Sequence, residues 1–447
     1  MKRFSSVFIK NSIFSAVLFF ALVVPFAAHA QSVLTLNNAL TMARSHNPEL
    51  KKLDFQSDAA RLGKWVAISG YLPHISASAS NYFDADYAKE GVILGGSSIF
   101  MPMAFPQVQM DINASLTVFD GLATYNMYRA ACDTAEAAHL QYQRAKFKLD
   151  ESVRMQFWRA LAAADLVRVA KENIKTLQNH LKLVKARRYA GVSTNYDVLR
   201  IEAELDDADA DLLLAQNNEA DSRRQLLDIL GVSRNRERHL KLNGTLPIPT
   251  AERVPPGLQL NLSQRPDVEA QTKMEMAASR KNKAALGEWF PRVNLFATEQ
   301  FYHYGAFSPL VVDQPGYQNA WAYGVRLTWN IFDGGRSIAD KSIESDLYNE
   351  EKQITRRVYL TSASEFARFK RSYSYNCALY QARMQAVEKS QESVRLAALA
   401  VRAGTGTDTD ELDAELELFR ARAGVVQAQV GAAEALANLE LALGHRI

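Results

Sequence analysis

Cysteine is nearly absent from this chain of 447 residues, in which only Cys132 and Cys377 occur. Two cysteines cannot form the framework of several disulfides that holds many small secreted folds together. Both lie inside segments with a helical pattern, so we expect inert thiols at these positions. The fold must therefore be held by packing and hydrogen bonds rather than by cross-links.

Long apolar runs are also missing once the N-terminal segment 1–30 is set aside. That segment has a basic start, an apolar core over 13–26 and an Ala28-His29-Ala30 end, the pattern of a cleaved secretory signal peptide. No cysteine directly follows the cleavage site, so no lipid anchor is indicated. No later stretch reaches 18 apolar residues without charges, so we expect no membrane-spanning helix downstream. The sequence predicts an exported protein.

An excess of charge of one sign is absent as well. The net charge of +3 equals the contribution of Lys2, Arg3 and Lys10 in the signal peptide, so the rest of the chain is close to neutral. A neutral chain gives no reason to expect nucleic-acid binding. Motifs for nucleotide binding (G-x-x-x-x-G-K-[ST]), for a serine nucleophile (G-x-S-x-G) and for zinc hydrolysis (H-E-x-x-H) do not occur. We therefore expect no enzyme activity, no cofactor and no metal site.

What the chain does contain is a long internal repeat. Pro73 in GYLP pairs with Pro291 in EWFP, and VFDG at 118–121 pairs with IFDGG at 331–335. The spacing is 291 − 73 = 218 for the first pair and 331 − 118 = 213 for the second. The spacing of 213 also relates the decapeptides AGVSTNYDVL and AGTGTDTDEL. A repeat of this length with one change in spacing indicates internal duplication.

Each copy has the same order of segments: a helix, two strands, a very long helix, a turn and a shorter helix. The long helices are expected over 122–190 and 335–402, and the shorter ones over 195–230 and 408–443. Neither long segment contains proline, and about 68 residues at 1.5 Å each give a helix of about 100 Å. The expected division of the chain is 1–30 signal peptide, 31–70 N-terminal helix, 71–120 first β-hairpin, 121–231 first helical hairpin, 232–259 linker, 260–288 helix, 289–334 second β-hairpin and 335–447 second helical hairpin.

Strands are predicted between these helices by two-residue alternation. The apolar positions of QVQMDINASLTVF include Leu116 and Val118, and those of AWAYGVRLTWNIF include Trp321, Tyr323 and Trp329. The intervening residues are mostly polar or small, so each strand has one apolar and one polar face. A protein core or lipid could cover the apolar face. A soluble β-sandwich stays open, but export without a spanning helix favours an outer-membrane barrel with a wet lumen.

Four strands cannot close such a barrel, and open sheet edges are not tolerated in lipid. Bacterial barrels have at least about eight strands, so the chain must share its barrel with copies of itself. Two, three or four copies would all supply enough strands, and the strand arithmetic does not choose among them.

The order of these segments resembles the TolC family of outer-membrane efflux proteins over essentially all of the chain after residue 30. The resemblance is carried by LTLNNALTMARSHNPEL, by GYLP and EWFP before the strands, by VFDG and IFDGG after them, and by the two decapeptides. It implies an α+β membrane protein in which three chains form one 12-stranded outer-membrane β-barrel. The long coiled-coil helices would form an α-barrel in the periplasm.

The same resemblance implies a passive exit duct of a tripartite efflux pump or a type I secretion system. Its partners would be two further copies of the chain, a periplasmic adaptor (membrane fusion) protein, an inner-membrane RND, ABC or MFS transporter, and outer-membrane lipid. The loops at 84–106 and 303–319 would face outside the cell. The adaptor would dock at the two helical turns, which comprise Gly191, Val192, Ser193, Thr194, Gly404, Thr405, Gly406 and Thr407.

A gate at these turns is also implied by the resemblance. Asp410 and Asp413 match positions where family members carry acidic residues at the narrow end of the pore, and Asp197 matches an acidic partner on the first hairpin. Three copies of each carboxylate would favour cations and should raise some of their pKa values by crowding. Helix capping is an equal explanation for Asp197 and Asp410, because each follows a Thr by three residues. Asp413 has no such alternative role.

Two positions depart from the family's pattern. Where relatives have an arginine and a tyrosine that help to tie the closed state together, this chain has Gly406 and Val401. Closure through those links is therefore not expected here. An alternative function also stays open, in which a non-transporting structural or adhesive protein uses its barrel only as an anchor.

Overall fold

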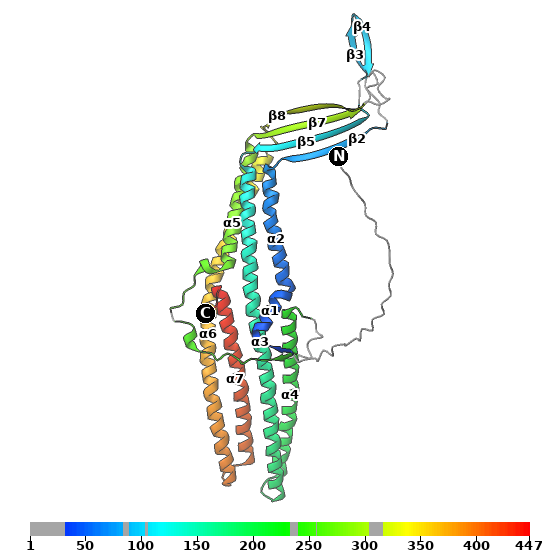
Figure 1. Cartoon of the computed structure of the whole chain (residues 1–447). Coiled ribbons are helices and arrows are strands. Elements are labelled where there is room, and N and C mark those ends of the chain that lie inside the picture. The colour runs from blue at the N-terminus through cyan, green and yellow to red at the C-terminus, as the bar shows by residue number, and fades with distance from the viewer. Residues whose placement is uncertain (1–31, 84–88, 103–105, 233–239, 256, 304–315) are drawn as a thin grey trace, which may run out of the picture.

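The computed structural model describes residues 32–83, 89–102, 106–232, 240–255, 257–303 and 316–447. The predicted signal peptide and parts of the loops at 84–106 and 303–319 lie outside these residues. The molecule is long, with a β-sheet at one end and the turns of two helical hairpins at the other (Figure 1).

Two helical hairpins of equal dimensions make up most of the length. The first joins α3 (Ala123–Tyr189) to α4 (Asn195–Leu230), and the second joins α6 (Arg336–Arg402) to α7 (Asp408–Leu443). The long helices have 67 residues each and the shorter ones 36. These bounds agree with the sequence-based expectation to within one residue at each end.

The helices that lead towards the sheet are more broken than expected. The segment expected as one N-terminal helix within 31–70 is divided into α1 (Leu36–His46) and α2 (Pro48–Ile68). The helix expected over 260–288 is α5 (Pro266–Ala284), with 3₁₀ turns at Leu262–Gln264 and Ala285–Trp289. Proline lacks an N–H and clashes with the preceding turn, so it starts a helix and does not continue one. Pro48 and Pro266 therefore set the starts of α2 and α5.

The sheet contains β2 (His74–Asn81), β5 (Val108–Phe119), β7 (Arg292–His303) and β8 (Gln318–Thr328), all antiparallel and in that spatial order. Strands from both repeats thus meet at the β5–β7 pair. Within the described residues β2 and β8 each have only one neighbour in the sheet, so both outer edges of the sheet are open.

The register separates the sheet into a mainly apolar and a mainly polar face, although Glu299 lies opposite Trp321 on the first and Phe296 opposite Gly324 on the second. Tyr323 lies opposite Ala297, which lies opposite Ala114, and the same face continues at the next pairs through Leu295 and Leu116. Because side chains alternate along a strand, the intervening positions share the other face. That polar face carries Ser76, Ser78, Asp111, Asn113, Thr298, Gln300 and Arg326.

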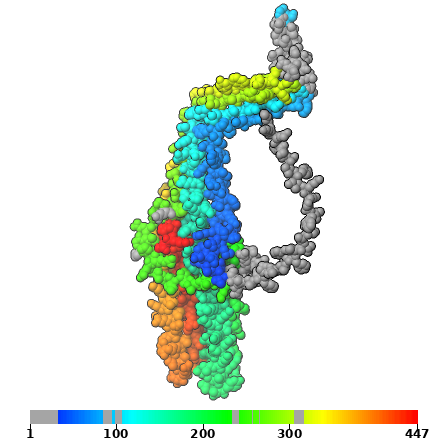
Figure 2. All heavy atoms as spheres, viewed as in Figure 1, coloured from blue at the N-terminus to red at the C-terminus, as the bar shows by residue number. Residues whose placement is uncertain are grey.

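No second layer covers the apolar face in the part of the chain that the structure describes. Trp321 is 66% exposed, Tyr323 76% and Leu327 64%. A β-sandwich buries such residues against a second sheet, so the open alternative of a soluble sandwich is wrong for this chain. Figure 2 shows the sheet as a single layer that extends beyond the helices.

Two of the residues expected on the apolar face occupy irregular positions. Val118 is the unpaired extra residue of a β-bulge, because the register with β7 shifts between Thr117 and Phe119. Trp329 lies beyond the end of β8, so its assignment to that strand was wrong. Its indole N–H donates a hydrogen bond to the carbonyl of Trp289 at 3.2 Å, which draws it away from the β-ladder.

A small hairpin, β3 (Lys89–Leu94) and β4 (Ser97–Pro102), projects beyond the sheet (Figure 1). Gly95 and Gly96 form the two-residue turn between the two strands. Both glycines have positive φ, 61° and 86°, as the tight turns of hairpins require.

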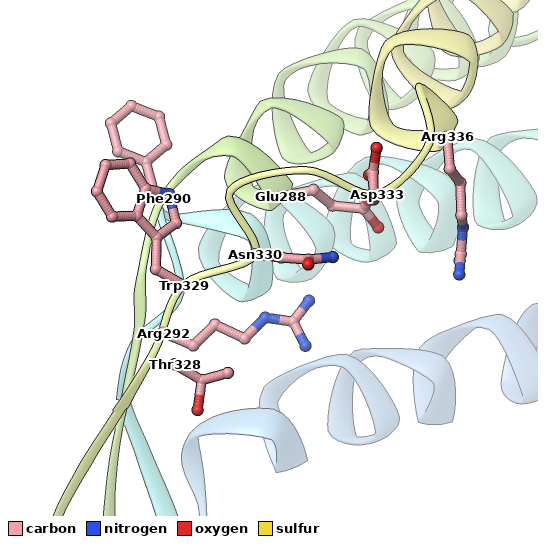
Figure 3. A pocket seen from close by; sticks show the side chains of 8 residues that line it. All are labelled: Glu288, Phe290, Arg292, Thr328, Trp329, Asn330, Asp333 and Arg336. Carbon is pink, nitrogen blue, oxygen red and sulfur yellow. The ribbon is translucent and has the colours of Figure 1, made fainter.

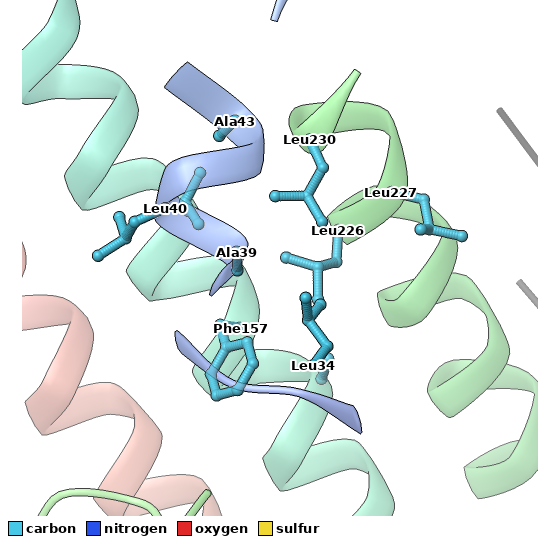
Figure 4. Close-up of a cluster of buried hydrophobic side chains, with 10 residues drawn as sticks. Leu34, Ala39, Leu40, Ala43, Phe157, Leu226, Leu227 and Leu230 are labelled. Carbon is cyan, nitrogen blue, oxygen red and sulfur yellow. The ribbon is translucent and has the colours of Figure 1, made fainter. Parts of the chain in front are cut away.

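A second short pairing anchors the N-terminal segment to the middle of the molecule. β1 (Ser32–Leu34) runs parallel to β6 (Leu240–Leu242), which belongs to the connection between the repeats. Leu34 then packs with residues of α1, α3 and α4 in a closed apolar cluster (Figure 4). Its members include Ala39, Leu40, Ala43, Phe157, Leu226, Leu227 and Leu230.

Candidate functional site

The two strand exits have the same local design. The carboxylate of Asp120 accepts a hydrogen bond from the backbone N–H of Thr124 at 2.8 Å. Asp333, which stands at the equivalent position of the second repeat, accepts one from the N–H of Ser337 at 2.9 Å. Each carboxylate therefore satisfies a free N–H in the first turn of a long helix, α3 or α6. The VFDG and IFDGG motifs thus fix where each strand gives way to its long helix.

A cavity of about 500 Å³ lies at the second strand exit (Figure 3). Arg292, Asp333 and Arg336 give its lining a mixed charge, and Phe290 and Trp329 lie together at one side. The carboxyl group of Asp333 has a lowered pKa because of its hydrogen bonds from Ser337 and Gly335. Its charge is therefore used to hold the start of α6.

The C-terminal ends of the shorter helices, α4 and α7, are held by equivalent contacts in the two repeats. The side-chain amide of Asn47 donates a hydrogen bond to the carbonyl of Ile229 at 2.9 Å. Arg265, the equivalent residue of the second repeat, donates one to the carbonyl of Ala442 at 3.1 Å. These contacts attach α2 to the end of α4 and α5 to the end of α7, so the same joint is built once with an amide and once with a guanidinium.

The turn that joins the two helices of each hairpin follows one backbone pattern. We call residues 190–194 the first tip and residues 403–407 the second tip. In the first tip the N–H groups of Gly191 and Val192 donate to the carbonyls of Arg188 and Arg187 at 3.0 and 2.9 Å. This is the Schellman arrangement, which needs a positive φ at its glycine, here 78°. Gly404 of the second tip has a φ of 75° and the equivalent bond, to Val401.

Asp197 and Asp410 both act as helix caps. The carboxylate of Asp410 accepts hydrogen bonds from the backbone N–H and the hydroxyl of Thr407, and the Thr407 hydroxyl accepts one from the N–H of Asp410. The same capping box joins Asp197 to Thr194, with the same three distances of 2.8, 2.6 and 3.2 Å. The capping role that the spacing allowed is therefore present at both tips.

The hydrogen bonds from the threonines lower the pKa of both carboxyl groups. Within one chain this shift is opposite to the increase expected from crowding of like charges. Both groups therefore stay ionised at neutral pH through contacts inside their own tip.

Asp413 makes a contact that the sequence analysis missed. One of its carboxylate oxygens lies 2.8 Å from the guanidinium of Arg200 on α4, so the two hairpins are tied together one turn beyond the caps. The side chains are 56% and 30% exposed, which makes this a partly screened pair. Arg200 and Asp413 are 213 residues apart and so occupy equivalent positions in the two repeats.

A second contact between the tips is more enclosed. The carboxylate of Asp408 lies against both the guanidinium of Arg187 and the hydroxyl of Ser193, and its side chain is 9% exposed. These residues bring the end of α3, the first tip and the start of α7 together. The two hairpins accordingly lie side by side as far as their tips (Figure 2). The sequence shows that Arg187 and Asp408 carry opposite charges, but it does not show that the two residues are in contact.

A protein-family model described as outer membrane efflux protein matches residues 39–232 and 257–445 of the chain. The chain belongs to the outer membrane efflux protein family. The two matched ranges end within a few residues of Gly231 and Gly444, where α4 and α7 end.

Curated members of the family resemble the chain along most of its length. The pyoverdine export outer membrane protein OpmQ of Pseudomonas putida is 23% identical over 426 residues, which cover 92% of this chain and 85% of the relative. The toluene efflux pump outer membrane protein TtgC of Pseudomonas putida is 22% identical over 416 residues, covering 89% and 80%.

Solved structures share the fold. The outer membrane protein VceC of Vibrio cholerae superposes with a TM-score of 0.76 at 18% identity, over 92% of this chain and 96% of that one. The CmeC outer membrane channel of Campylobacter jejuni gives a TM-score of 0.78 at 15% identity, over 92% and 85%. Long paired helices below a small sheet are thus a property of the outer membrane efflux protein family.

Membership also fixes the coarse location and role of the chain, an outer-membrane efflux channel component. None of the helices in the described ranges is long and apolar enough to cross a membrane.

Proposed function

We propose that three copies of this chain form one exit duct through the outer membrane. The observation that carries the proposal is the four-stranded sheet, with one apolar face, one polar face and two open edges. Pairing β8 of one copy with β2 of the next would satisfy both edges, and three copies would give a closed barrel of about 12 strands. Lipid would cover Leu116, Trp321 and Tyr323, and the polar face would line the lumen.

The helical hairpins extend this duct into the periplasm in the same proposal. A helix of 67 residues is about 100 Å long, which is far more than a membrane needs. The tips would then dock with a periplasmic adaptor, and an inner-membrane RND, ABC or MFS transporter would supply the energy. No sequence motif for nucleotide binding occurs in the chain, which fits a passive conduit.

We further propose that the contacts between the tips hold the duct closed at rest. Arg200–Asp413 and Arg187–Asp408 both join the first hairpin to the second, and opening the end of the duct would separate such neighbours. These pairs take the place of the links that the family has at the positions of Val401 and Gly406. In three copies, Asp197, Asp410 and Asp413 would also make the entrance acidic and favour cations.

Conductance in planar bilayers tests the duct and its gate together. We expect small, cation-selective currents from the wild-type channel and several-fold larger ones from Asp413→Ala and Arg200→Ala, because each removes the same link. The double variant Arg200→Asp with Asp413→Arg restores the ion pair and should restore small currents.

Arg420→Ala is the matched control, because Arg420 pairs at 2.8 Å with Glu417 on its own helix and ties nothing to the other hairpin. Unchanged currents in both single variants would show that the gate lies elsewhere. An absence of current from folded, inserted protein would favour the alternative of a structural or adhesive protein with a barrel anchor.

A further inference from the structure

A histidine is buried at the contact between the two hairpins without a hydrogen-bond partner for its Nε2 atom. His180 lies on α3, and its side chain is 2% exposed. In sequence it lies between Leu177 and Val184, which belong with Leu412 to an apolar cluster to which both hairpins contribute. A buried polar atom without a partner costs free energy and calls for an explanation, such as a water or an ion that it contacts.

Two carboxylates of α7 lie beside this histidine. Glu411 and Glu415 are four residues apart and therefore lie on one face of the helix, one turn above the other. The Oε2 atom of Glu415 is 3.4 Å from His180 Nδ1 and is itself buried without a hydrogen-bond partner. Among the described residues, no lysine or arginine forms an ion pair with either glutamate. Two like charges four residues apart on a helix repel each other, and a cation beside both of them offsets this repulsion.

We propose that His180, Glu411 and Glu415 bind a divalent transition-metal cation that joins the first hairpin to the second. One ligand atom from each of the three side chains lies within 4.8 Å of the others. Ligand atoms at about 2.1 Å from a tetrahedral ion are about 3.4 Å apart. His180 Nδ1 and Glu415 Oε2 already have this separation, and the partly exposed Glu411 side chain supplies a third ligand atom within 4.8 Å.

The ligand chemistry selects the class of ion. One imidazole with two carboxylates suits Zn²⁺ and its first-row neighbours, whereas Ca²⁺ and Mg²⁺ prefer ligand sets made of oxygen alone. The apolar cluster around His180 limits access by water and holds its ring in place, as the surroundings of metal ligands commonly do. Three protein ligands leave at least one coordination position for water.

The internal repeat offers a comparison inside the same chain. At the repeat spacing of 213, the positions equivalent to His180, Glu411 and Glu415 are Ser393, Val198 and Glu202. Val198 has no ligand atom in its side chain, and Glu202 is paired with Lys185 at 2.7 Å. The equivalent positions therefore do not form a second set of three ligands, so we expect one ion per chain. Helix capping cannot explain the presence of both glutamates, because Glu415 lies beyond the first turn of α7.

Equilibrium dialysis of the full-length channel, freed of metal and held in detergent, against Zn²⁺ tests the proposal. We expect one ion bound per chain, and binding weakened by more than about 10-fold in His180→Asn and in Glu411→Gln, since even outer-shell partners of a metal have effects of that size. Glu411 is only partly buried, so its variant should fold even if His180→Asn does not. Binding of Co²⁺ should give an absorption band that both variants lose.

Two matched controls separate this site from other acidic groups. Glu202→Gln alters the repeat equivalent of Glu415 and should bind as wild type does. Asp413→Asn removes a carboxylate of the tips and should also leave the cobalt band unchanged. The proposal is overturned if wild-type protein binds no Zn²⁺, or if Asp413→Asn loses the ion while His180→Asn keeps it. Neither result depends on conductance, so the proposed duct is tested independently.

Discussion

The two helical hairpins of this chain have the same backbone and different charges. Each pairs a helix of 67 residues with one of 36, and each turns through a glycine of positive φ followed by a capping box. Where the hairpins meet, however, the first supplies Arg187 and Arg200 and the second supplies Asp408 and Asp413. The helix lengths, turns and caps are alike in both repeats, whereas the side chains at the contact between the two hairpins carry opposite charges.

The joints at the other end of the hairpins show a similar difference. Asn47 and Arg265 occupy equivalent positions and bind carbonyls at equivalent positions, Ile229 and Ala442. Only Arg265 brings a charge with it, and that charge is balanced by Asp267 at 2.7 Å. The second repeat therefore depends on an ion pair whose guanidinium is buried and whose carboxylate is 30% exposed, where the first uses a neutral hydrogen bond.

The largest difference between the repeats is expected from Arg265→Ala. Arg265 is 3% exposed, and its loss leaves Asp267 without its main partner, which should cost about 3 kcal/mol. Asn47→Ala, the matched change in the first repeat, should cost about 1 to 2 kcal/mol through a lost cap and a lost hydrogen bond. Hydrogen exchange at the ends of α4 and α7 measures both. Equal losses would mean that the charge adds nothing to the joint.

A smaller effect is expected at the tips from Asp408→Ala. The guanidinium of Arg187 is 20% exposed and would lose its only ion pair among the described residues, so we expect the tip contact to weaken by about 2 kcal/mol. Asn195 stands at the equivalent position of the first repeat and accepts a hydrogen bond from Arg188 of its own hairpin. Asn195→Ala should therefore change stability by less than about 0.5 kcal/mol. Exchange rates of the tip amides compare the two, and equal effects would contradict the asymmetry.

The caps should respond alike in both repeats. Thr194→Ala and Thr407→Ala each remove one capping box of the same geometry and should each cost about 1 kcal/mol. The corresponding serine variants retain the hydroxyl and act as controls. Exchange at the first turns of α4 and α7 provides the measurement. A clear difference between the two alanine variants would show that the shared backbone pattern hides unequal stability.

Acid should weaken the joint held by Arg265 and Asp267 more than the joint held by Asn47, whereas neither joint should change near neutral pH. Burial raises the pKa of Asp267, but hydrogen bonds from Arg265 and the charges of Arg144 and Arg265 outweigh it, so the pKa is lowered. A lowered folded-state pKa stabilises the fold above the unfolded value of about 3.9, and that contribution is lost as the pH falls through the folded pKa.

The joint of α5 should therefore loosen below about pH 3.9, whereas the joint of α2, held by the neutral Asn47, should not. Pulse-labelled hydrogen exchange at the starts of α2 and α5, between about pH 5 and pH 3, follows both joints in one experiment. Loosening of α2 first would overturn the expectation.

The lengths of the helices could be predicted from the sequence because few residues set them. Gly191 and Gly404 end the long helices, so local chemistry alone defines these boundaries, whereas the break before Pro48 was missed although proline commonly starts a new helix. The β3–β4 hairpin was missed because its Gly95-Gly96 turn looks like any flexible loop. The short pairing of β1 with β6 has too few residues for an alternating pattern.

The contacts between the hairpins could not be predicted in the same way. A period of 3.6 residues indicates which face of a helix is buried, but it does not indicate which helix lies opposite. Asp413 was therefore singled out without its partner. Arg200 could have been found from the repeat itself, because a position that carries opposite charges in two copies is a candidate for a contact between those copies.

The Arg200–Asp413 pair also shows whether this ion pair arose before or after the internal duplication. When the two halves of the gene were identical, these two positions carried the same residue, and two arginines or two aspartates at this contact would have repelled each other. The ion pair therefore arose after the duplication, once each half could change independently of the other. A half-length ancestor assembled from identical chains could not have placed unlike charges at this contact.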